Sequence, residues 1–147
     1  MNKCAVYSHN MANDLYHDAV RNALEKDGWV ITDDPFVFRL DRVSFRMDLG
    51  AEKIISAARG TEKIIIEIKT FSQTSFIHAF HEATGQYDNY LIALEEIAPD
   101  RKLFLAVPHE IWNTYFQERF IQKVIDRKHI KIILYGYTNE IITLWKN

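Results

Sequence analysis

The first amphipathic segment of the chain runs from Asn13 to Asp27. Its apolar residues recur every three or four positions, which predicts one buried face of a helix. The residues on this face are Leu15, Ala19, Val20, Ala23 and Leu24. Asn13 can cap the beginning of the helix, and Gly28 can end it. The pattern leaves two interpretations for residues 1–10, which belong either to the compact fold or to a peripheral N-terminal extension.

Between residues 29 and 69 the chain turns to short segments rich in β-branched and aromatic residues, which are typical of strands. Trp29 to Thr32 can adopt an extended conformation, and Asp33-Asp34-Pro35 then turns the chain. The predicted strands are Phe36–Leu40, Phe45–Ile55 and Lys63–Lys69. Arg59-Gly60-Thr61 is a hairpin turn between the last two. Together these segments predict a three-stranded antiparallel meander.

The second half of the chain alternates helical and strand patterns. An apolar stripe over Ser75 to Ile97 predicts a long helix that ends at Pro99. A continuous apolar run is typical of a strand that is buried on both faces, and Leu103–Val107 is such a run. The remaining elements are a helical region from Pro108 to about Arg127 with a break near Glu118, and strands at Ile130–Tyr135 and Ile141–Trp145. This order predicts an α/β fold with a mixed β-sheet, an antiparallel meander plus helix-linked strands, flanked by helices.

The strand that ends the meander carries two charged residues on one face. Alternate residues of a strand share a face, so Ile65, Glu67 and Lys69 lie together, about 7 Å apart along the strand. Burying a charge is costly unless it is paired or bound to a metal ion. Glu67 and Lys69 are therefore candidate site residues, and the alternative is that this face is simply exposed to solvent.

Asp48 lies on the preceding predicted strand, and antiparallel pairing can bring it beside Glu67. Two carboxylates at one point repel each other unless a divalent cation neutralises them. Mg²⁺, with Mn²⁺ as a substitute, takes carboxylate oxygens and keeps several of its waters. Lys69 would then stabilise charge on a phosphate. The alternative for Asp48 is a turn or bulge residue before Gly50.

Asp48 followed by Glu67-Ile68-Lys69 resembles the PD-(D/E)XK nuclease pattern. Met47 stands where that pattern often has its proline. The resemblance implies a restriction-endonuclease-like fold with Asp48 and Glu67 as metal ligands and Lys69 as a catalytic residue. The reaction would be attack of an activated water on a phosphodiester.

Gln86 and His17 are further candidates for the same site. In related nucleases a helix after the E-X-K strand can place a glutamine near the metal, and the amide of Gln86 suits a bound water or phosphate. His17 can reach the site from the first helix, where relatives often carry a glutamate. The alternatives are a boundary residue over the core for Gln86 and a half-buried structural histidine for His17.

Several longer stretches carry a closer resemblance. They are residues 12–29 with Asp34-Pro35, 48–51, 66–71, 80–87 and 106–108. They are similar to the XisH family, the fdxN-element excision controlling factors of cyanobacteria. The resemblance implies a role in programmed DNA excision during heterocyst development, alongside a site-specific recombinase and a companion protein, XisI. Members are described as nuclease-like in fold, which leaves open whether they cut DNA.

Composition narrows these hypotheses. A chain of 147 residues suits one domain, which we take to be residues 1–147. The net charge of −2 excludes a strongly basic DNA-coating protein but not a nucleic-acid enzyme. Cys4 is the single cysteine, which excludes an internal disulfide, and no apolar run approaches a membrane span. We therefore expect a cytoplasmic protein with no membrane partner.

Two non-catalytic hypotheses stand beside the nuclease. The first is a module that binds DNA or protein and controls a recombinase. The second is a protein whose main surface binds a XisI-like companion, with Trp112, Tyr115 and Trp145 as candidate contacts or, alternatively, as core residues. The sequence also leaves open whether the protein forms a homodimer. An intact set of Asp48, Glu67 and Lys69 favours the enzyme.

Overall fold

A computed structural model describes the backbone of residues 3–56, 60–72 and 75–147, and side chains from residue 15 onward except those of 54–56 within these ranges. The helices of this described part are α1 (Lys3–Lys26), α2 (Phe76–Ile97), α3 (His109–Tyr115) and α4 (Arg119–Arg127). Its strands are β1 (Val30–Asp33), β2 (Phe36–Leu40), β3 (Val43–Met47), β4 (Leu49–Ser56), β5 (Gly60–Ile68), β6 (Arg101–Pro108), β7 (Ile132–Gly136) and β8 (Ile141–Lys146).

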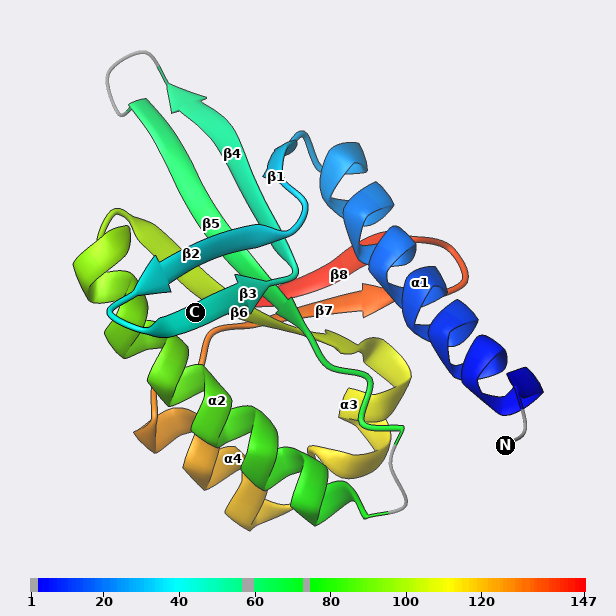
Figure 1. The fold of residues 1–147 in the computed structure, drawn as a ribbon. Helices are drawn as coiled ribbons and strands as arrows, with labels where there is room; N and C mark the ends of the chain where they lie inside the picture. The colour runs from blue at the N-terminus through cyan, green and yellow to red at the C-terminus, as the bar shows by residue number, and fades with distance from the viewer. Residues whose placement is uncertain (1–2, 57–59, 73–74) are drawn as a thin grey trace.

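The strands form a six-stranded sheet in the order β1-β4-β5-β6-β7-β8 and a separate two-stranded ribbon, β2-β3. Strands β4 and β5 are antiparallel, β5, β6 and β7 run parallel, and β8 is antiparallel to β7. Helix α1 covers one face of the sheet, and α2 and α4 cover the other (Figure 1). The mixed α/β architecture expected from the sequence is confirmed.

Both faces of the sheet are buried at its centre. Ile64 and Ile66 of β5 pack on the α1 side, and Ile65 packs on the α2 side. Strand β6 behaves in the same way, with Phe104 under α1 and Leu105 under α2. Strands enclosed on both faces become continuous apolar runs, which is the pattern that the sequence shows here.

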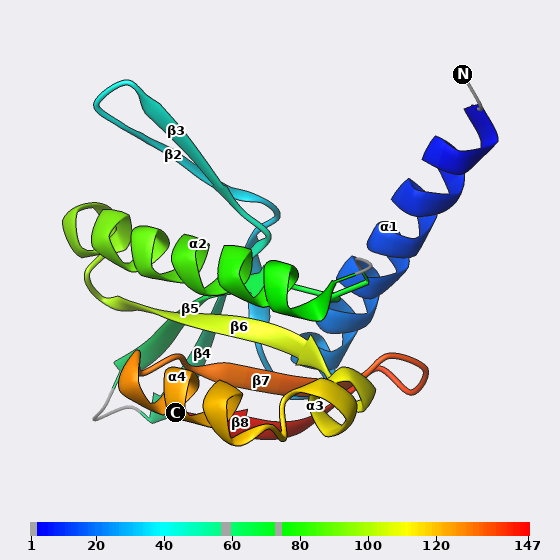
Figure 2. The ribbon, with the colours of Figure 1, turned by 90° about the horizontal axis from the view of Figure 1, so that it is seen from below.

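The first helix is longer than the sequence pattern predicts. Helix α1 begins at Lys3, so Asn13 lies inside it and is not its cap, which corrects our prediction. The segment before Asn13 contains no glycine or proline that would stop a helix from extending towards the N-terminus. Figure 2 shows the first turns of α1 projecting beyond the sheet.

The predicted meander is wrong in one respect. The segment expected as one strand, 45–55, is divided at Asp48 into β3 and β4. Strand β3 pairs only with β2, and β4 pairs with β5 on one side and with β1 on the other. The antiparallel meander of the sheet is therefore β1-β4-β5, and not the three strands that the sequence predicts. The predicted turn at Arg59-Gly60-Thr61 falls partly outside the described residues.

The second half follows the prediction closely. Ser75 caps α2, and its side-chain oxygen accepts a hydrogen bond from the backbone N–H of His78. The helical region after Pro108 is divided into α3 and α4 near Glu118, and β8 forms an edge of the sheet. No helix in the described part of the chain is long and apolar enough to cross a membrane.

Candidate active site

The candidate site lies where the chain leaves the ribbon and enters the sheet. Strand β3 ends at Met47 and β4 begins at Leu49, so Asp48 occupies the bend between them. Leu49 is paired with Ile66, and continuing this register by one residue sets Asp48 opposite Glu67. Opposite residues of antiparallel strands project to the same face. The carboxylate oxygen Oδ2 of Asp48 accepts a hydrogen bond of 2.7 Å from the backbone N–H of Ile68, which holds Asp48 against β5.

Glu67 projects from the end of β5 towards the α2 side of the sheet. Its side chain is only 12% exposed, and the Lys69 ammonium lies 3.7 Å from its Oε1. Its other oxygen, Oε2, is buried and has no hydrogen-bond partner among the described residues. A buried carboxylate oxygen without a partner is unusual, because its desolvation is not compensated. This oxygen is therefore free to accept a hydrogen bond or to bind a ligand in the cavity.

The surroundings of Glu67 disfavour its ionised form. Burial, and next the charge of Asp48, raise the pKa of Glu67 to about 8. The Lys69 ammonium and a hydrogen bond from the Asp48 backbone act in the opposite direction and lower this pKa. The nearby Tyr90 phenol responds to the same field, because burial and then Glu67 and Asp48 raise its pKa. Two carboxylates in a poorly solvated position cannot both ionise without cost, and a bound cation would offset that cost and displace the Glu67 proton.

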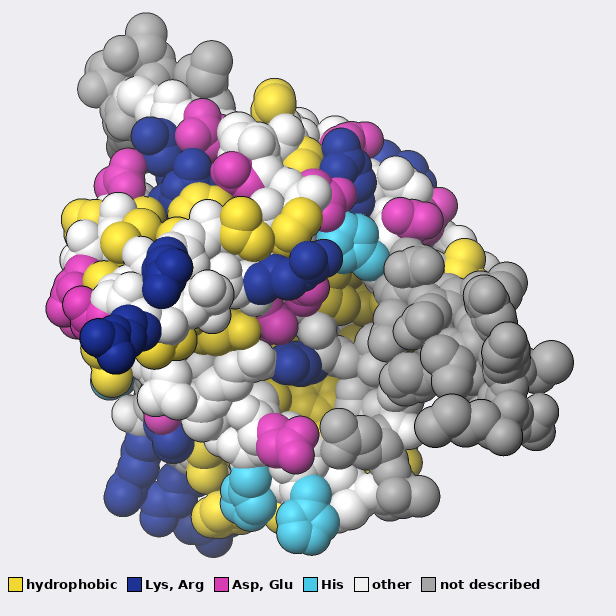
Figure 3. All heavy atoms as spheres, viewed as in Figure 1, with side chains coloured by type: hydrophobic (Ala, Val, Ile, Leu, Met, Phe, Trp, Pro, Cys, Tyr) yellow, Lys and Arg dark blue, Asp and Glu magenta, His cyan; other side chains and the backbone are white. Residues whose placement is uncertain are grey.

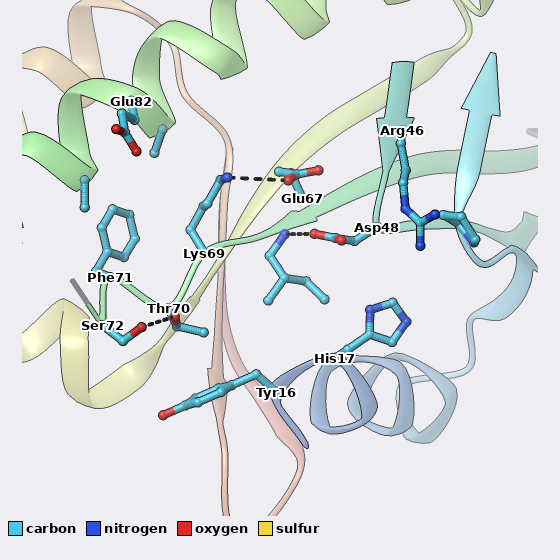
Figure 4. Close-up of a pocket in the computed structure, with 14 residues that line it drawn as sticks. Tyr16, His17, Arg46, Asp48, Glu67, Lys69, Thr70, Phe71, Ser72 and Glu82 are labelled. Carbon is cyan, nitrogen blue, oxygen red and sulfur yellow. Dashed lines mark hydrogen bonds and ion pairs between the residues drawn. The ribbon is translucent and has the colours of Figure 1, made fainter. Parts of the chain in front are cut away.

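A cavity of about 470 Å³ opens over these residues. Its lining consists of Tyr16, His17, Pro35, Arg46, Asp48, Glu67, Ile68, Lys69, Thr70, Phe71, Ser72, Ala79, Glu82 and Ala83. Figure 3 shows acidic and basic side chains together in this hollow, below the ribbon. In Figure 4 the side chains of Glu67 and Lys69 point towards each other, and Asp48 lies beside them at the end of β3. Of the five residues predicted for the site, Asp48, Glu67, Lys69 and His17 line the same cavity.

His17 reaches the cavity from α1, but another carboxylate holds its ring. Its Nε2 lies 2.7 Å from Oδ1 of Asp34, and Arg21 forms an ion pair with the other oxygen of Asp34. This network joins α1 to the turn before β2. His17 therefore sits at the rim of the cavity with one ring nitrogen already engaged.

Gln86 lies on α2 and is not among the residues that line the cavity. Its amide nitrogen donates a hydrogen bond of 2.8 Å to the Tyr90 hydroxyl, which donates in turn to the backbone carbonyl of Arg46 at 3.2 Å. Its Oε1 is buried and has no hydrogen-bond partner in the described part of the chain. Gln86 is thus connected to the strand that carries Asp48 through Tyr90.

Five charged or polar lining residues were missed by the sequence analysis: Tyr16, Arg46, Thr70, Ser72 and Glu82. Arg46 lies two positions before Asp48, and the alternation of side chains along a strand could have indicated it. Tyr16 neighbours His17 on α1. Glu82 lies on α2 between the small residues Ala79 and Ala83, whose size lets the cavity approach that helix.

The donor set can be compared with what a metal ion requires. No group of three or more His, Cys, Asp or Glu side chains in the described residues could hold a metal ion. Mg²⁺ is commonly bound by only one or two carboxylates, with waters completing its octahedron. The free Oε2 of Glu67 and the adjacent Asp48 carboxylate fit this weaker type of site.

Comparison with known proteins is consistent with the motifs. The sequence model of the XisH protein family matches residues 11–143. The chain belongs to the XisH family. An XisH family protein from Nostoc punctiforme PCC 73102 is 39% identical, with a TM-score of 0.82 over 90% of this chain and 99% of that one. No curated protein matches the chain.

A second solved XisH relative is described as an fdxN element excision controlling factor protein, from Anabaena variabilis. It is 40% identical, with a TM-score of 0.83 over 91% of this chain and 99% of that one. The two XisH relatives therefore share the fold over about nine-tenths of this chain.

Proposed function

We propose that this XisH-family protein acts in the excision of a DNA element as a divalent-metal-dependent endonuclease of the PD-(D/E)XK class. The observation that carries the proposal is the shared cavity of Asp48 and Glu67, with the Lys69 ammonium 3.7 Å from Glu67. The link to excision of an fdxN-type element comes from the description of the Anabaena variabilis relative.

The arrangement of strands supports the superfamily assignment. The motif residues lie at one end of the antiparallel pair β4-β5: Asp48 directly precedes β4, Glu67 is on β5 and Lys69 directly follows β5. The strands on the other side of β5 run parallel to it. Helix α2 follows β5 and packs beneath the site. A restriction-endonuclease-like core has this combination of a hairpin that carries the motif and helix-linked strands.

In the proposed site Asp48 and Glu67 would hold Mg²⁺ or Mn²⁺. When bound, such an ion supplies Lewis-acid activation of the phosphodiester. The Lys69 side chain is 32% exposed, and its ammonium would stabilise negative charge on the reacting phosphate. Asp48 also keeps β5 in position through its hydrogen bond to the Ile68 N–H. Gln86 and His17 would have supporting roles.

One observation favours a second function, that of a non-catalytic controlling factor. Exposed apolar side chains gather around a separate hollow at the ends of α2, α3 and α4. They include Tyr115 and Phe120, which are 43% and 59% exposed. Such a patch suits a XisI-like partner or a second copy of the chain. Of the other predicted contacts, Trp112 stacks on Phe116, and Trp145 packs against Trp29 and Phe104.

Cleavage assays separate the two functions. Purified protein with Mg²⁺ or Mn²⁺ is incubated with linear, branched and supercoiled DNA, with and without a XisI-like partner. We expect Glu67→Gln and Lys69→Ala to abolish cleavage, because each removes part of the charge stabilisation that the reaction requires. DNA binding should survive Lys69→Ala, since one lysine is one of several phosphate contacts.

Matched control variants lie on the same strand, β5. Glu62 and Lys63 stand at its other end and form ion pairs outside the cavity, with Lys102 and with Glu52 and Asp100 respectively. Glu62→Gln and Lys63→Ala should leave cleavage unchanged. Inactivity of the wild type on all substrates, with partner binding unaffected by Glu67→Gln, would establish the controlling-factor function instead.

A further inference from the structure

The ribbon β2-β3 differs in charge from the rest of the molecule. Residues 36–47 contain three arginines, Arg39, Arg42 and Arg46, and one acidic residue, Asp41. The ribbon therefore carries a net charge of +2 in a chain whose net charge is −2. Positive charge is therefore concentrated on the ribbon, although the chain as a whole is slightly acidic.

The two faces of the ribbon have different chemistry. The inner face is aromatic: Phe38 stacks on Phe45 with ring centroids 4.9 Å apart, and Phe45 meets Tyr90 of α2 edge-to-face at 6.1 Å. The outer face carries the exposed residues of the two strands, among which Arg39 is paired with Ser44 and Val37 with Arg46. The ribbon thus attaches through its aromatic face and presents its basic face to solvent.

In the part of the chain that the structure describes, the three arginines have no carboxylate partners. Other basic side chains, such as Arg21, Lys63 and Arg101, form ion pairs with acidic residues. Among the described residues, none of the arginines of the ribbon forms an ion pair within 4.0 Å. The Nε of Arg39 donates to the backbone carbonyl of Asp41, a contact within the ribbon itself. Their charge is therefore available to an external anion.

The ribbon is connected directly to the proposed active site. Arg46 lines the cavity, and the chain continues from β3 into Asp48. The hydrogen bond from the Tyr90 hydroxyl to the Arg46 carbonyl fastens this end of the ribbon to α2. The ribbon then extends away from the body of the molecule (Figure 2), and dark-blue side chains lie on its surface and at the cavity (Figure 3).

We infer that the outer face of β2-β3 is a DNA-binding arm that holds the phosphate backbone of a duplex next to the cleavage cavity. The inference rests on the proposed function and specifies its substrate as double-stranded DNA. A two-stranded ribbon has the width that a duplex groove admits. Binding of single strands depends on bases stacking on aromatic side chains, but the phenylalanines of this ribbon face inward. Arginine–phosphate contacts position the duplex without selecting its sequence.

The test measures duplex binding by the intact chain in EDTA, where no cleavage occurs, over a series of salt concentrations. The variant Arg39→Ala/Arg42→Ala leaves Arg46 and the cavity untouched. Each lost phosphate contact lowers the slope of log affinity against log salt by about 0.9, so the double variant should lower it by about 2. We expect affinity at about 0.1 M salt to fall roughly tenfold or more.

The matched control is Lys123→Ala/Arg127→Ala on α4, which removes the same charge from exposed positions distant from the ribbon (Figure 1). This control should keep nearly wild-type binding. Equal losses in both double variants would overturn the inference, because they would show an effect of net charge alone. Equal or tighter binding of single-stranded DNA by the wild type would overturn the assignment of a duplex.

The failure of this inference is distinguishable from failure of the proposed function. If the wild type binds and cleaves DNA and the Arg39→Ala/Arg42→Ala variant behaves identically, only the assignment of the ribbon as a DNA-binding arm is overturned. Wild-type protein that binds no DNA in any condition would overturn both. Loss of binding to a XisI-like protein, with DNA binding intact, would reassign the ribbon to a protein partner. Thermal melts of the variants should match the wild type, since both side chains are exposed.

Discussion

Replacing Glu67 by glutamine should stabilise the protein in the absence of metal. The carboxyl group is buried, faces Asp48 and has one oxygen without a partner. Glutamine has nearly the same shape and keeps an acceptor oxygen, but it carries no charge to be desolvated. A purely structural glutamate would behave in the opposite way and destabilise the fold when removed.

The magnitude follows from the pKa of Glu67, which rises from 4.5 to about 8 on folding. Below pH 4.5 both folded and unfolded states hold the proton, so Glu67 has no effect on stability. As the pH rises towards 8, the unfolded state releases the proton and the folded state keeps it, so the free energy of unfolding falls. With about 1.4 kcal/mol per pKa unit, the cost is on the order of 3 kcal/mol at pH 7.

The attraction of the Lys69 ammonium is already included in this pKa, because it is one of the effects that lower it. We therefore expect Glu67→Gln to raise the free energy of unfolding by about 3 kcal/mol at pH 7 and by only about 1 kcal/mol at pH 5. For a domain of this size, a gain of about 3 kcal/mol corresponds to a melting temperature roughly 6–12 °C higher.

The assay is thermal unfolding in EDTA at pH 5, 7 and 8, with Glu62→Gln as the control on the same strand. The melting temperature of Glu67→Gln should exceed that of the wild type by an amount that grows with pH. The control variant should show no such increase. In millimolar Mn²⁺ the wild type should melt at a higher temperature than Glu67→Gln, because only the wild type binds the ion. A variant less stable than the wild type at pH 8 without metal would refute the reasoning and assign Glu67 a structural role.

Three further predictions concern the same region. Asp48→Asn should lower the pKa of Glu67 towards its usual value, because it removes the repelling charge, and carbon-detected NMR titration of the Glu67 carboxyl checks this. The affinity for Mn²⁺ should rise with pH by up to about tenfold per pH unit and level off near pH 8, since binding displaces the Glu67 proton. Calorimetry measures this affinity, and an affinity that stays constant between pH 6 and 8 would contradict the prediction. Tyr90→Phe should cost about 1–2 kcal/mol, because Gln86 and the Arg46 carbonyl lose their shared partner. Hydrogen exchange at β3 should increase in that variant, whereas unchanged exchange would show that the ribbon is held by its aromatic packing alone.

The sequence by itself determined the elements whose signals are local. Ser75 begins α2 because its side chain caps the following backbone, and the apolar run 103–107 is a buried central strand because no polar residue interrupts it. The shared face of Glu67 and Lys69 follows from the period of two along β5, and their ends are 3.7 Å apart in the fold. The family was also visible in the sequence, because its motifs are short and contiguous.

Only the tertiary structure decided how distant segments meet. At the break, Asp48 accepts a hydrogen bond from the Ile68 N–H, twenty residues away, and β1 pairs with β4 directly after the break. The ring of His17 is held by Asp34, a contact that no local pattern encodes. Periodicity describes which side a residue faces, whereas strand order and side-chain partners depend on the packing of all elements at once. For that reason the sequence indicated which residues are candidates for the site, and the fold decided which of them share one cavity.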